Sequence, residues 1–459
     1  MTPGRTARDR PVDRSGGRAG EQVRLEVGPV AHGGSCVARL EGRVVFVRHA
    51  LPGEEVLARL TEAREQDRYW RADAVEVLRA SPDRVEPPCP LARPGLCGGC
   101  DWQHAALPAQ RGLKAAVVVE QLRRLAGLDV AALWPGFEVE PVPGDVDGLG
   151  WRTRMRFTVD AAGRPGLHPH RSHDVIPVEH CPIAHPEVDR VGVGRVRWPG
   201  VTALEVAAAP ARTPVGDEEV EPQRLVVVDP AGPERRVDVP PLAARAAVAR
   251  RVPAGLERVR GRTWLEEQVT LDGERRTHRV TGSGFWQVHA GAAQTLLDAV
   301  LGAAGVRAGE RVLDLFCGAG LFTAGLAAAA GPGGSVVGIE SDARAVADAR
   351  RSLHDLPQVR VTQGRVDARL AWLVGDGQPL DTVDVVVLDP PRAGAGRGVT
   401  EAVLALRPRV VVYVACDPAS LARDLGTAAE LGYRAATLRA FDLFPMTHHV
   451  ECIVTLVPA

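Results

Sequence analysis

The sequence predicts a multidomain α/β protein, in which a small N-terminal β-barrel and a central α+β domain precede a doubly wound C-terminal domain. The length of 459 residues exceeds what one hydrophobic core usually supports, so two or three domains are expected. Short apolar runs separated by turn residues fill positions 21–80, as in a small barrel. From 281 to 459, strand-like and helix-like patterns alternate, which indicates a parallel sheet covered by helices on both faces.

The overall composition is that of an ordinary globular protein, with 45% hydrophobic and 25% charged residues. A net charge of -1 argues against a uniformly basic nucleic-acid coat but leaves room for a local basic face. No apolar run approaches the roughly 20 residues that a membrane helix needs. The first twenty residues contain five arginines and lack the apolar core of a secretory signal. We therefore expect a disordered tail over 1–20 and a cytoplasmic protein with no membrane partner.

The N-terminal barrel is expected to contain five short strands, separated by turn signals such as Gly33-Gly34 and Pro52-Gly53. They are Gln22–Val27, Gly34–Leu40, Arg43–Val47, Glu55–Leu60 and Trp70–Val77. Five strands at this spacing favour a closed barrel of the oligonucleotide-binding kind. The stretch Val44–Glu54 resembles the TRAM domain, an RNA-binding barrel found on several RNA-modifying enzymes. The resemblance predicts RNA as a partner; a barrel that packs only against its own protein is the alternative.

The region from 81 to 280 is rich in Pro, Gly and Arg and is expected to be mostly irregular. One exception is Pro108–Gly127, where the apolar spacing and the final glycine predict an amphipathic helix. Alternation in Trp151–Phe157 places Arg152, Arg154 and Arg156 on one face of a strand. Phosphate contact by this face is favoured over a merely solvated one.

Four cysteines of this region form a candidate metal site. Cys89, Cys97 and Cys100 fall within twelve residues, and Cys181 follows later in the chain. Four thiolates suit either zinc or a [4Fe-4S] cluster. Structural zinc usually has two paired C-x2-C knuckles, and only one such pair is present here. The spacing therefore favours iron–sulfur over zinc, with free buried cysteines as the third alternative.

A glycine-containing turn predicts a cofactor site in a Rossmann-like domain. The strand-like run Val312–Phe316 leads into a turn with Gly318 and Gly320, and an Ala-rich helix follows. Glycines in such a turn let the backbone approach a ligand closely. Glu340 ends the next strand-like run. At this position a carboxylate can accept hydrogen bonds from both hydroxyls of a ribose. The fingerprint of dinucleotide-binding sites has a small residue at the position that Thr323 occupies in this chain. S-adenosylmethionine is therefore favoured over NAD as the cofactor. A sheet edge without any ligand is the remaining alternative.

Cys416 is the candidate nucleophile. It ends the apolar run Val410–Ala415, and a helix start follows it, so its thiol lies where open α/β sheets bind their ligands. The stretches Asp389–Arg392 and Phe444–Glu451 point to the same edge. Together these segments predict a cysteine nucleophile and a carboxylate base.

Taken in order along the chain, these motifs resemble one family. The motifs are the cysteine quartet, Phe285-Trp286-Gln287, Asp314–Gly320, Asp389–Arg392, Cys416–Pro418 and Phe444–Glu451. From about 21 to 459, the chain resembles bacterial RNA 5-methyluridine methyltransferases, which act on 23S ribosomal RNA or on the T-loop of transfer RNA.

The resemblance implies an S-adenosylmethionine-dependent enzyme that methylates C5 of a uridine in structured RNA. The TRAM barrel favours 23S rRNA over tRNA, and a monomer is expected because an RNA substrate needs one accessible face. It implies a TRAM barrel over 21–80, a central cluster-binding domain over 81–280 and a methyltransferase domain over 281–459. The helix at 108–127 is expected to pack on the last of these. The implied residues are Cys416 as nucleophile, Glu451 as base, Gln287, Phe316, Glu340 and Asp389 around S-adenosylmethionine, and Cys89, Cys97, Cys100 and Cys181 as ligands of a [4Fe-4S] cluster.

The chain departs from the family pattern after the nucleophile, where Asp417 stands in place of the usual Asn. A carboxylate beside the thiol would disfavour the thiolate, unless it points away as the N-cap of the following helix. We expect this capping role. Two alternatives stay open: an RNA base N-methyltransferase, which would not need Cys416, and an RNA-binding or RNA-folding protein with an inactive site.

Overall fold

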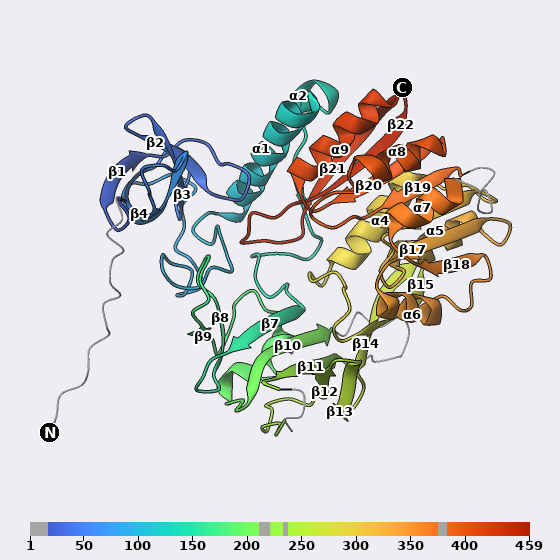
Figure 1. Ribbon diagram of the computed structural model, residues 1–459, viewed down its shortest axis with the longest axis horizontal. Coiled ribbons are helices and arrows are strands. Elements are labelled where there is room, and N and C mark those ends of the chain that lie inside the picture. Colours follow the sequence, from blue (N-terminus) through green and yellow to red (C-terminus); the bar gives the residue numbers. More distant parts are fainter. Residues whose placement is uncertain (1–16, 211–220, 233–236, 375–382) are drawn as a thin grey trace. The chain divides into compact units, whose positions relative to one another are not determined.

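The computed structural model describes residues 17–210, 221–232, 237–374 and 383–459, so most of the expected tail lies outside the described residues. The chain divides into two compact units, Met1–Arg84 and Val85–Ala459 (Figure 1). No helix in the described part of the chain is long and apolar enough to cross a membrane.

The N-terminal unit is built on one five-stranded sheet, in the order β1-β4-β5-β3-β2. Its strands are β1 (Gln22–Glu26), β2 (Cys36–Leu40), β3 (Arg43–Arg48), β4 (Glu55–Glu62) and β5 (Tyr69–Arg79). Burial alternates along β1, with Val23 and Leu25 inside, because successive side chains of a strand point to opposite faces. The five strands predicted from the turn signals are all present.

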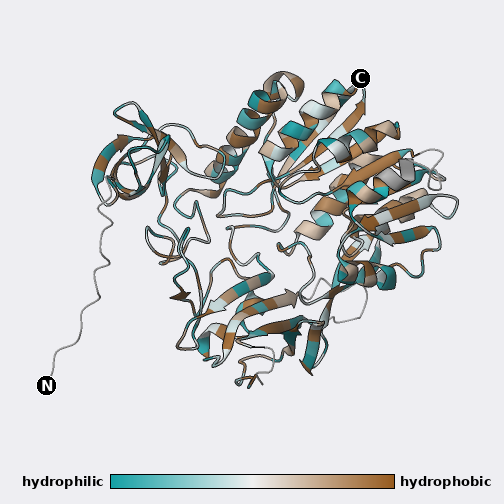
Figure 2. Cartoon of the chain, in the orientation of Figure 1, coloured by the Kyte–Doolittle hydropathy of each residue, from teal (hydrophilic) through white to brown (hydrophobic). Residues whose placement is uncertain are grey.

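The second unit contains an eight-stranded sheet, ordered β18-β17-β16-β19-β20-β22-β21-β6. Its strands are β6 (Val139–Pro141), β16 (Arg311–Leu315), β17 (Ser335–Glu340), β18 (Val359–Gln363), β19 (Val385–Leu388), β20 (Val410–Ala415), β21 (Tyr433–Asp442) and β22 (Glu451–Pro458). The strands from β18 to β20 are parallel, and β22 runs antiparallel to both of its neighbours. All four residues of β19 are buried, as expected for a strand covered on both faces, and Figure 2 shows these central strands as hydrophobic.

Helices cover both faces of this sheet (Figure 1). They are α1 (Leu107–Ala126), α4 (Ala292–Ala304), α5 (Leu321–Ala330), α6 (Ala343–Ser352), α7 (Val366–Val374), α8 (Arg397–Ala405) and α9 (Pro418–Glu430). One core cluster joins the strands to α1, α7, α8 and α9, and another joins them to α4 and α5. The Rossmann-like methyltransferase fold predicted from the alternating pattern is therefore present.

Helix α1 precedes the doubly wound segment in sequence but packs against α9 of that segment. Its Val118 and Leu122 are fully buried in the same core as Leu421 of α9. The helix ends at Gly127, whose φ of 67° is in the left-handed region that a C-terminal glycine adopts without strain. The short strand β6 follows it and extends the sheet beside β21, which the sequence did not indicate.

The region expected to be irregular contains a seven-stranded sheet, ordered β13-β12-β11-β10-β7-β8-β9, and a hairpin of β14 and β15. The strands are β7 (Arg154–Val159), β8 (Pro165–Leu167), β9 (Ile176–Pro177), β10 (Val201–Ala209), β11 (Gln223–Pro230), β12 (Ala247–Val252), β13 (Gly255–Arg260), β14 (Trp264–Leu271) and β15 (Glu274–Thr281). Short helical turns lie at α2 (Val130–Leu133), α3 (Pro186–Asp189) and Val193–Arg195. The prediction failed because the alanines of β10 and the arginines of β7 and β12 are poor strand signals, although the sheet buries a core around Leu204 and Val226.

The predicted iron–sulfur cluster of the central domain is wrong. Cys89, Cys97, Cys100 and Cys181 line one cavity of about 340 Å³, and none of the four is in a disulfide. Burial raises the pKa of Cys100 to about 12 and that of Cys181 to about 11. Within the described ranges, no group of three or more His, Cys, Asp or Glu side chains is arranged to hold a metal ion. The zinc alternative fails on the same ground.

Candidate active site

The candidate site lies at the carboxyl ends of the parallel strands. Leu315 of β16 pairs with Ile339 on one side and with Leu388 on the other. The next residues, Phe316, Glu340 and Asp389, therefore leave three adjacent strands at the same level. Because neighbouring strands are about 4.8 Å apart, these three residues meet at one edge of the sheet. The structure thus brings together three of the four residues predicted to surround S-adenosylmethionine.

The turn after β16 has a backbone shaped for a close ligand. Phe316 has a φ of 63°, which is uncommon for a bulky residue, and Gly318 and Gly320 have φ values of 54° and 86°. A Cβ at Gly320 would lie 2.7 Å from a methyl carbon of Leu353, so the position also lacks room for a side chain. Glu340 closes the turn by accepting a hydrogen bond from the Gly318 N–H at 3.2 Å.

Buried carboxyl groups give this edge an electrostatic character that suits a cation. Asp314 is fully buried; its Oδ2 accepts from Thr323 Oγ1 at 2.5 Å, and its Oδ1 has no partner among the described residues. Burial raises the pKa of Asp314 to about 7. Desolvation and then the charge of Asp314 raise the pKa of Asp389 to about 7 as well. A nearby positive charge would favour the ionised forms of these carboxyl groups.

The predicted nucleophile and base face each other across a strand pair. Ala415 of β20 pairs with Cys452 of the antiparallel β22. Continuing this register by one position places Cys416 opposite Glu451. Cys416 is half-buried, and Glu451 is 4% exposed. A thiol and a carboxyl group therefore share the edge at which the cofactor-site residues lie.

The surroundings of Cys416 and Glu451 both favour the neutral form of the group. Desolvation, followed by the charges of Glu451 and Asp389, raises the pKa of Cys416 to about 12, while Arg392 opposes this shift. Burial raises the pKa of Glu451 well above its usual value, and the charge of Asp389 adds to this. Perturbed pKa values of this kind cluster at functional sites.

Asp417 caps helix α9, as expected from its position before Pro418. Its Oδ1 accepts a hydrogen bond from the Ser420 N–H at 2.8 Å. The carboxylate is therefore directed to the helix N-terminus. The capping prediction is confirmed.

Helix α9 also holds the loop that follows Asp389, through residues that sequence reasoning missed. Asp424 Oδ2 accepts from the hydroxyl of Tyr413 at 2.6 Å and from the Ala395 N–H at 2.9 Å. Ser420 Oγ donates to the carbonyl of Arg392 at 2.9 Å. The only sequence signal for this network is a tyrosine in the otherwise aliphatic run Val410–Ala415.

The fourth predicted cofactor residue, Gln287, lies between β15 and α4. It lines a cavity of about 200 Å³ together with Thr153, Trp286 and His289. The neighbouring Phe285 is 69% exposed, which is unusual for a phenyl ring and leaves it available to a ligand or to RNA.

The three arginines expected on one strand face differ in exposure, since Arg154 is buried, Arg152 is half-buried and Arg156 is exposed. Arg154 is buried and forms an ion pair with Glu267 at 3.0 Å. Arg156 pairs with Asp229 at 2.6 Å. Phosphate contact is therefore the wrong interpretation for Arg154, because its guanidinium is not accessible.

Family models match three parts of the chain. A TRAM domain family model matches residues 18–75, and a tRNA (uracil-5-)-methyltransferase model matches residues 369–458, which include Cys416 and Glu451. A protein-L-isoaspartate(D-aspartate) O-methyltransferase model matches residues 287–387. These last residues include the glycine turn of the methyltransferase fold.

Close relatives span nearly the whole chain. A protein of Streptomyces avermitilis named as an uncharacterized RNA methyltransferase is 51% identical over 448 residues, covering 96% of this chain and 99% of the relative. One of Streptomyces coelicolor with the same description is 49% identical, covering 98% of this chain and 95% of the relative. The crystal structure of the Pyrococcus abyssi tRNA (uracil-54, C5)-methyltransferase with S-adenosyl-L-homocysteine has a TM-score of 0.67 and 22% identity. It covers 95% of this chain and 100% of that one, and it shows that the fold is shared.

A Rossmann-like sheet edge with a glycine turn, joined to a TRAM domain, defines an S-adenosylmethionine-dependent RNA methyltransferase. The chain belongs to the RNA 5-methyluridine methyltransferase family. The predicted family and enzyme class are confirmed, as are RNA as substrate and S-adenosylmethionine as cofactor.

Proposed function

We propose that this protein, acting as a monomer, methylates C5 of a uridine in structured RNA through a covalent adduct between Cys416 and C6 of the base. The observation that carries the proposal is the register of β20 and β22, which puts Cys416 opposite Glu451 when it is continued by one position, together with the effect of the Glu451 charge on the pKa of Cys416. Carbon 5 of uracil is a poor nucleophile, and addition of a thiolate at C6 creates an enolate whose charge reaches C5. This chemistry needs one thiol and one base, and the chain supplies both.

The residues divide the work as follows. When bound, S-adenosylmethionine supplies an electrophilic methyl group. Cys416 first loses its thiol proton to solvent, its Sγ then forms the bond to C6 as a thiolate, and the guanidinium of Arg392 favours this ionised form. Glu451 likewise gives up its carboxyl proton to solvent, and after methyl transfer the resulting carboxylate takes the proton from C5. The electrons of that C–H bond restore the C5–C6 double bond, and Sγ leaves from C6. Gln287, Phe316, Glu340 and Asp389 are proposed to hold the cofactor.

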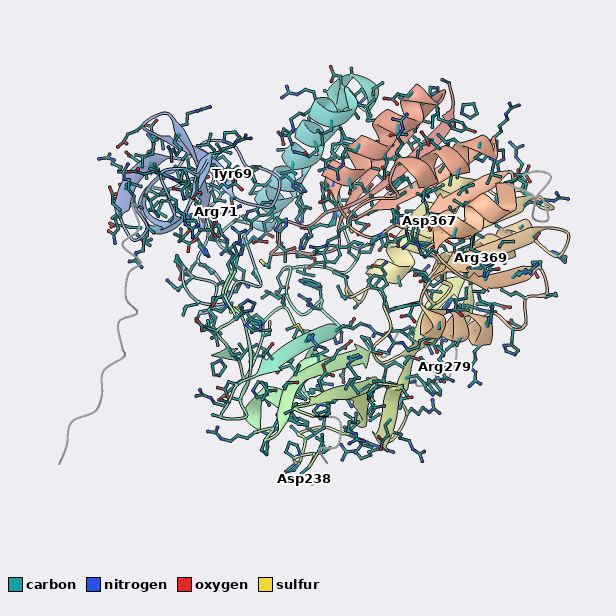
Figure 3. All side chains as sticks on the ribbon, viewed as in Figure 1. Tyr69, Arg71, Asp238, Arg279, Asp367 and Arg369 are labelled. Atoms are coloured by element: carbon teal, nitrogen blue, oxygen red, sulfur yellow. The ribbon has the colours of Figure 1, made fainter. Side chains whose placement is uncertain are left out.

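The RNA surface of the N-terminal unit is proposed to be centred on β5. Tyr69 is 44% exposed, and the Arg71 guanidinium lies 5.3 Å from the centre of its ring (Figure 3). Arg43 lies 4.6 Å from the ring centre of Trp70. Arginines beside aromatic rings offer phosphate contact and base stacking together. The target base must leave its stack to reach Cys416, so this surface would hold the flanking RNA.

The RNA class is proposed to be 23S rRNA, on the strength of the added TRAM barrel. Transfer RNA is the second candidate, because the structurally similar Pyrococcus abyssi enzyme is named for uracil-54 of tRNA. Tritium at C5 of uridine separates the two when it is placed in 23S fragments and in tRNA transcripts. The RNA that releases tritium in the presence of S-adenosylmethionine is the substrate.

Variants test the adduct itself. Cys416→Ala is expected to abolish both tritium release and formation of 5-methyluridine. Glu451→Gln is expected to accumulate an RNA–protein adduct that survives denaturing electrophoresis, because Sγ cannot leave until C5 loses its proton. Methylation that persists in Cys416→Ala would instead identify an N-methyltransferase, and cofactor binding without any methylation would identify an RNA-binding protein.

A further inference from the structure

The segment 443–450 leads directly into Glu451 and contains a strained residue. Met446 has a φ of 67°, a region that residues with bulky side chains rarely adopt. Such a conformation is strained and persists only where the surroundings hold it. The segment is well buried: Leu443 is 0%, Met446 5% and Val450 1% exposed.

The contacts that hold Met446 come from residues more than 300 positions earlier. Its N–H donates to Gln110 Oε1 at 2.8 Å, and its carbonyl accepts from the backbone N–H groups of Asp101 and Trp102 at 2.9 and 3.0 Å. Gln110 Nε2 also lies 3.3 Å from the Met446 sulfur. One glutamine and one backbone turn therefore fix the strained residue from both sides.

Two further contacts hold the ends of the same segment. Lys114 Nζ pairs with Asp442 at the end of β21 and donates to the carbonyl of Phe444 at 3.0 Å. Asp101 Oδ2 lies 2.6 Å from His448 Nδ1 and accepts from the His448 N–H at 3.1 Å. Because Gln110 and Lys114 are four residues apart on α1, they project from one face of the helix.

The cation that pairs with Asp442 is a lysine, which is unusual in this chain. Lys114 is the only lysine in a chain whose lysines and arginines total 56, so every other member of that set is arginine. Lys114 is 0% exposed, and Asp442 is 2% exposed. An ammonium group is a compact point charge, whereas a guanidinium is a broad planar fork. The buried position between a carboxylate and a carbonyl suits the compact cation.

We propose that Lys114, Gln110 and Asp101 form a clamp that positions Glu451 against Cys416 for removal of the C5 proton. These are positioning residues, because they contact the 442–448 segment and not the reacting groups. The inference rests on the proposed function, since it assigns the clamp to the base step. Cys416 is anchored separately, by β20 and by the capped start of α9. Loosening the clamp should therefore slow release of the adduct more than its formation.

Single-turnover methylation with excess enzyme tests the clamp in the full-length protein. The measured quantity is the ratio of denaturation-resistant RNA–protein adduct to released 5-methyluridine product at an early time. Lys114→Met and Gln110→Met are expected to raise this ratio and to lower kcat by about ten- to a hundredfold, the effect of a misplacement near 1 Å. KM for RNA should stay close to the wild-type value. Arg123→Gln, an exposed site on the same helix, is the matched control.

The ratio distinguishes positioning from simple loss of folded protein. A smaller folded fraction lowers adduct and product together and leaves their ratio unchanged, so an unchanged ratio in both variants would overturn the clamp. Gln110→Met is the second variant because it introduces no unpaired charge if Lys114→Met folds poorly. Failure of the proposed function has a different signature: methylation by Cys416→Ala, or no adduct with Glu451→Gln.

Discussion

The thiol of Cys416 is surrounded by Glu451, Asp389 and Arg392, and these charges determine how easily it ionises. Burial and the two carboxylates raise its pKa to about 12, so the free protein holds a neutral thiol at pH 7. The thiolate is the reactive form. As long as the pH is below the pKa, the thiolate fraction grows about tenfold for each unit by which the pH rises. We expect alkylation of Cys416 by iodoacetamide to accelerate up to about pH 10 without a plateau. Peptide mass spectrometry follows this residue separately from the other cysteines, and a plateau near neutral pH would contradict the prediction.

At the neighbouring position, substitutions of Asp417 show whether its carboxylate affects the ionisation of the Cys416 thiol. Because its side chain caps α9, Asp417→Asn should keep the cap and leave the pH dependence of Cys416 alkylation unchanged. Asp417→Ala should lower the free energy of unfolding by about 1 kcal/mol, the usual loss of an N-cap. Urea denaturation measures the stability change. A shift of the alkylation profile in the Asn variant would mean that the carboxylate acts on the thiol directly.

At the scale of elements, α9 links the strand that carries Cys416 to the loop after Asp389. Tyr413 of β20 donates its hydroxyl proton to Asp424 of α9, and the same hydroxyl accepts from the Ala395 N–H at 2.9 Å. Tyr413→Phe leaves both partners short of one hydrogen bond and should lower the free energy of unfolding by about 1–3 kcal/mol. Urea denaturation of Tyr413→Phe beside Tyr433→Phe provides a comparison, because Tyr433 bonds only a remote carbonyl, that of Pro408. Equal methylation rates in the two variants would show that this link does not position the loop.

The sequence predicted those elements whose signal is local. The sequence predicted that Phe316, Glu340, Asp389 and Cys416 lie at one edge of the sheet. This was possible because the carboxyl ends of parallel strands lie at the same edge. The central sheet was missed because alanine-rich and arginine-rich strands lack a clear period, and their burial depends on partners distant in sequence. The cysteine spacing indicated proximity, and the four side chains do share a cavity. Spacing does not show whether the four sulfurs are arranged around a metal, and the prediction of an iron–sulfur cluster failed on that point.

At the scale of the Val85–Ala459 unit, the Lys114–Asp442 pair joins α1 to the last hairpin of the main sheet. Loss of one partner leaves an unpaired buried charge, so Lys114→Met should lower the free energy of unfolding by about 3–5 kcal/mol. Replacing both, as Lys114→Met with Asp442→Leu, should recover most of this stability, because no charge is then left unpaired. Urea unfolding of the three proteins measures both effects. If the double variant is no more stable than Lys114→Met, the pair is not the source of the loss.

Because Lys114 is the only lysine and is buried, proteolysis at this residue can measure how often helix α1 detaches. A protease that cleaves only after lysine has one target bond in this sequence, on the carboxyl side of Lys114. That bond is in the middle of α1, where the folded helix withholds it from a protease active site. Cleavage into 1–114 and 115–459 then requires α1 to detach, and when reclosing is fast its rate follows the population of the open form. One band on a gel would therefore measure how often the segment before Glu451 loses its support.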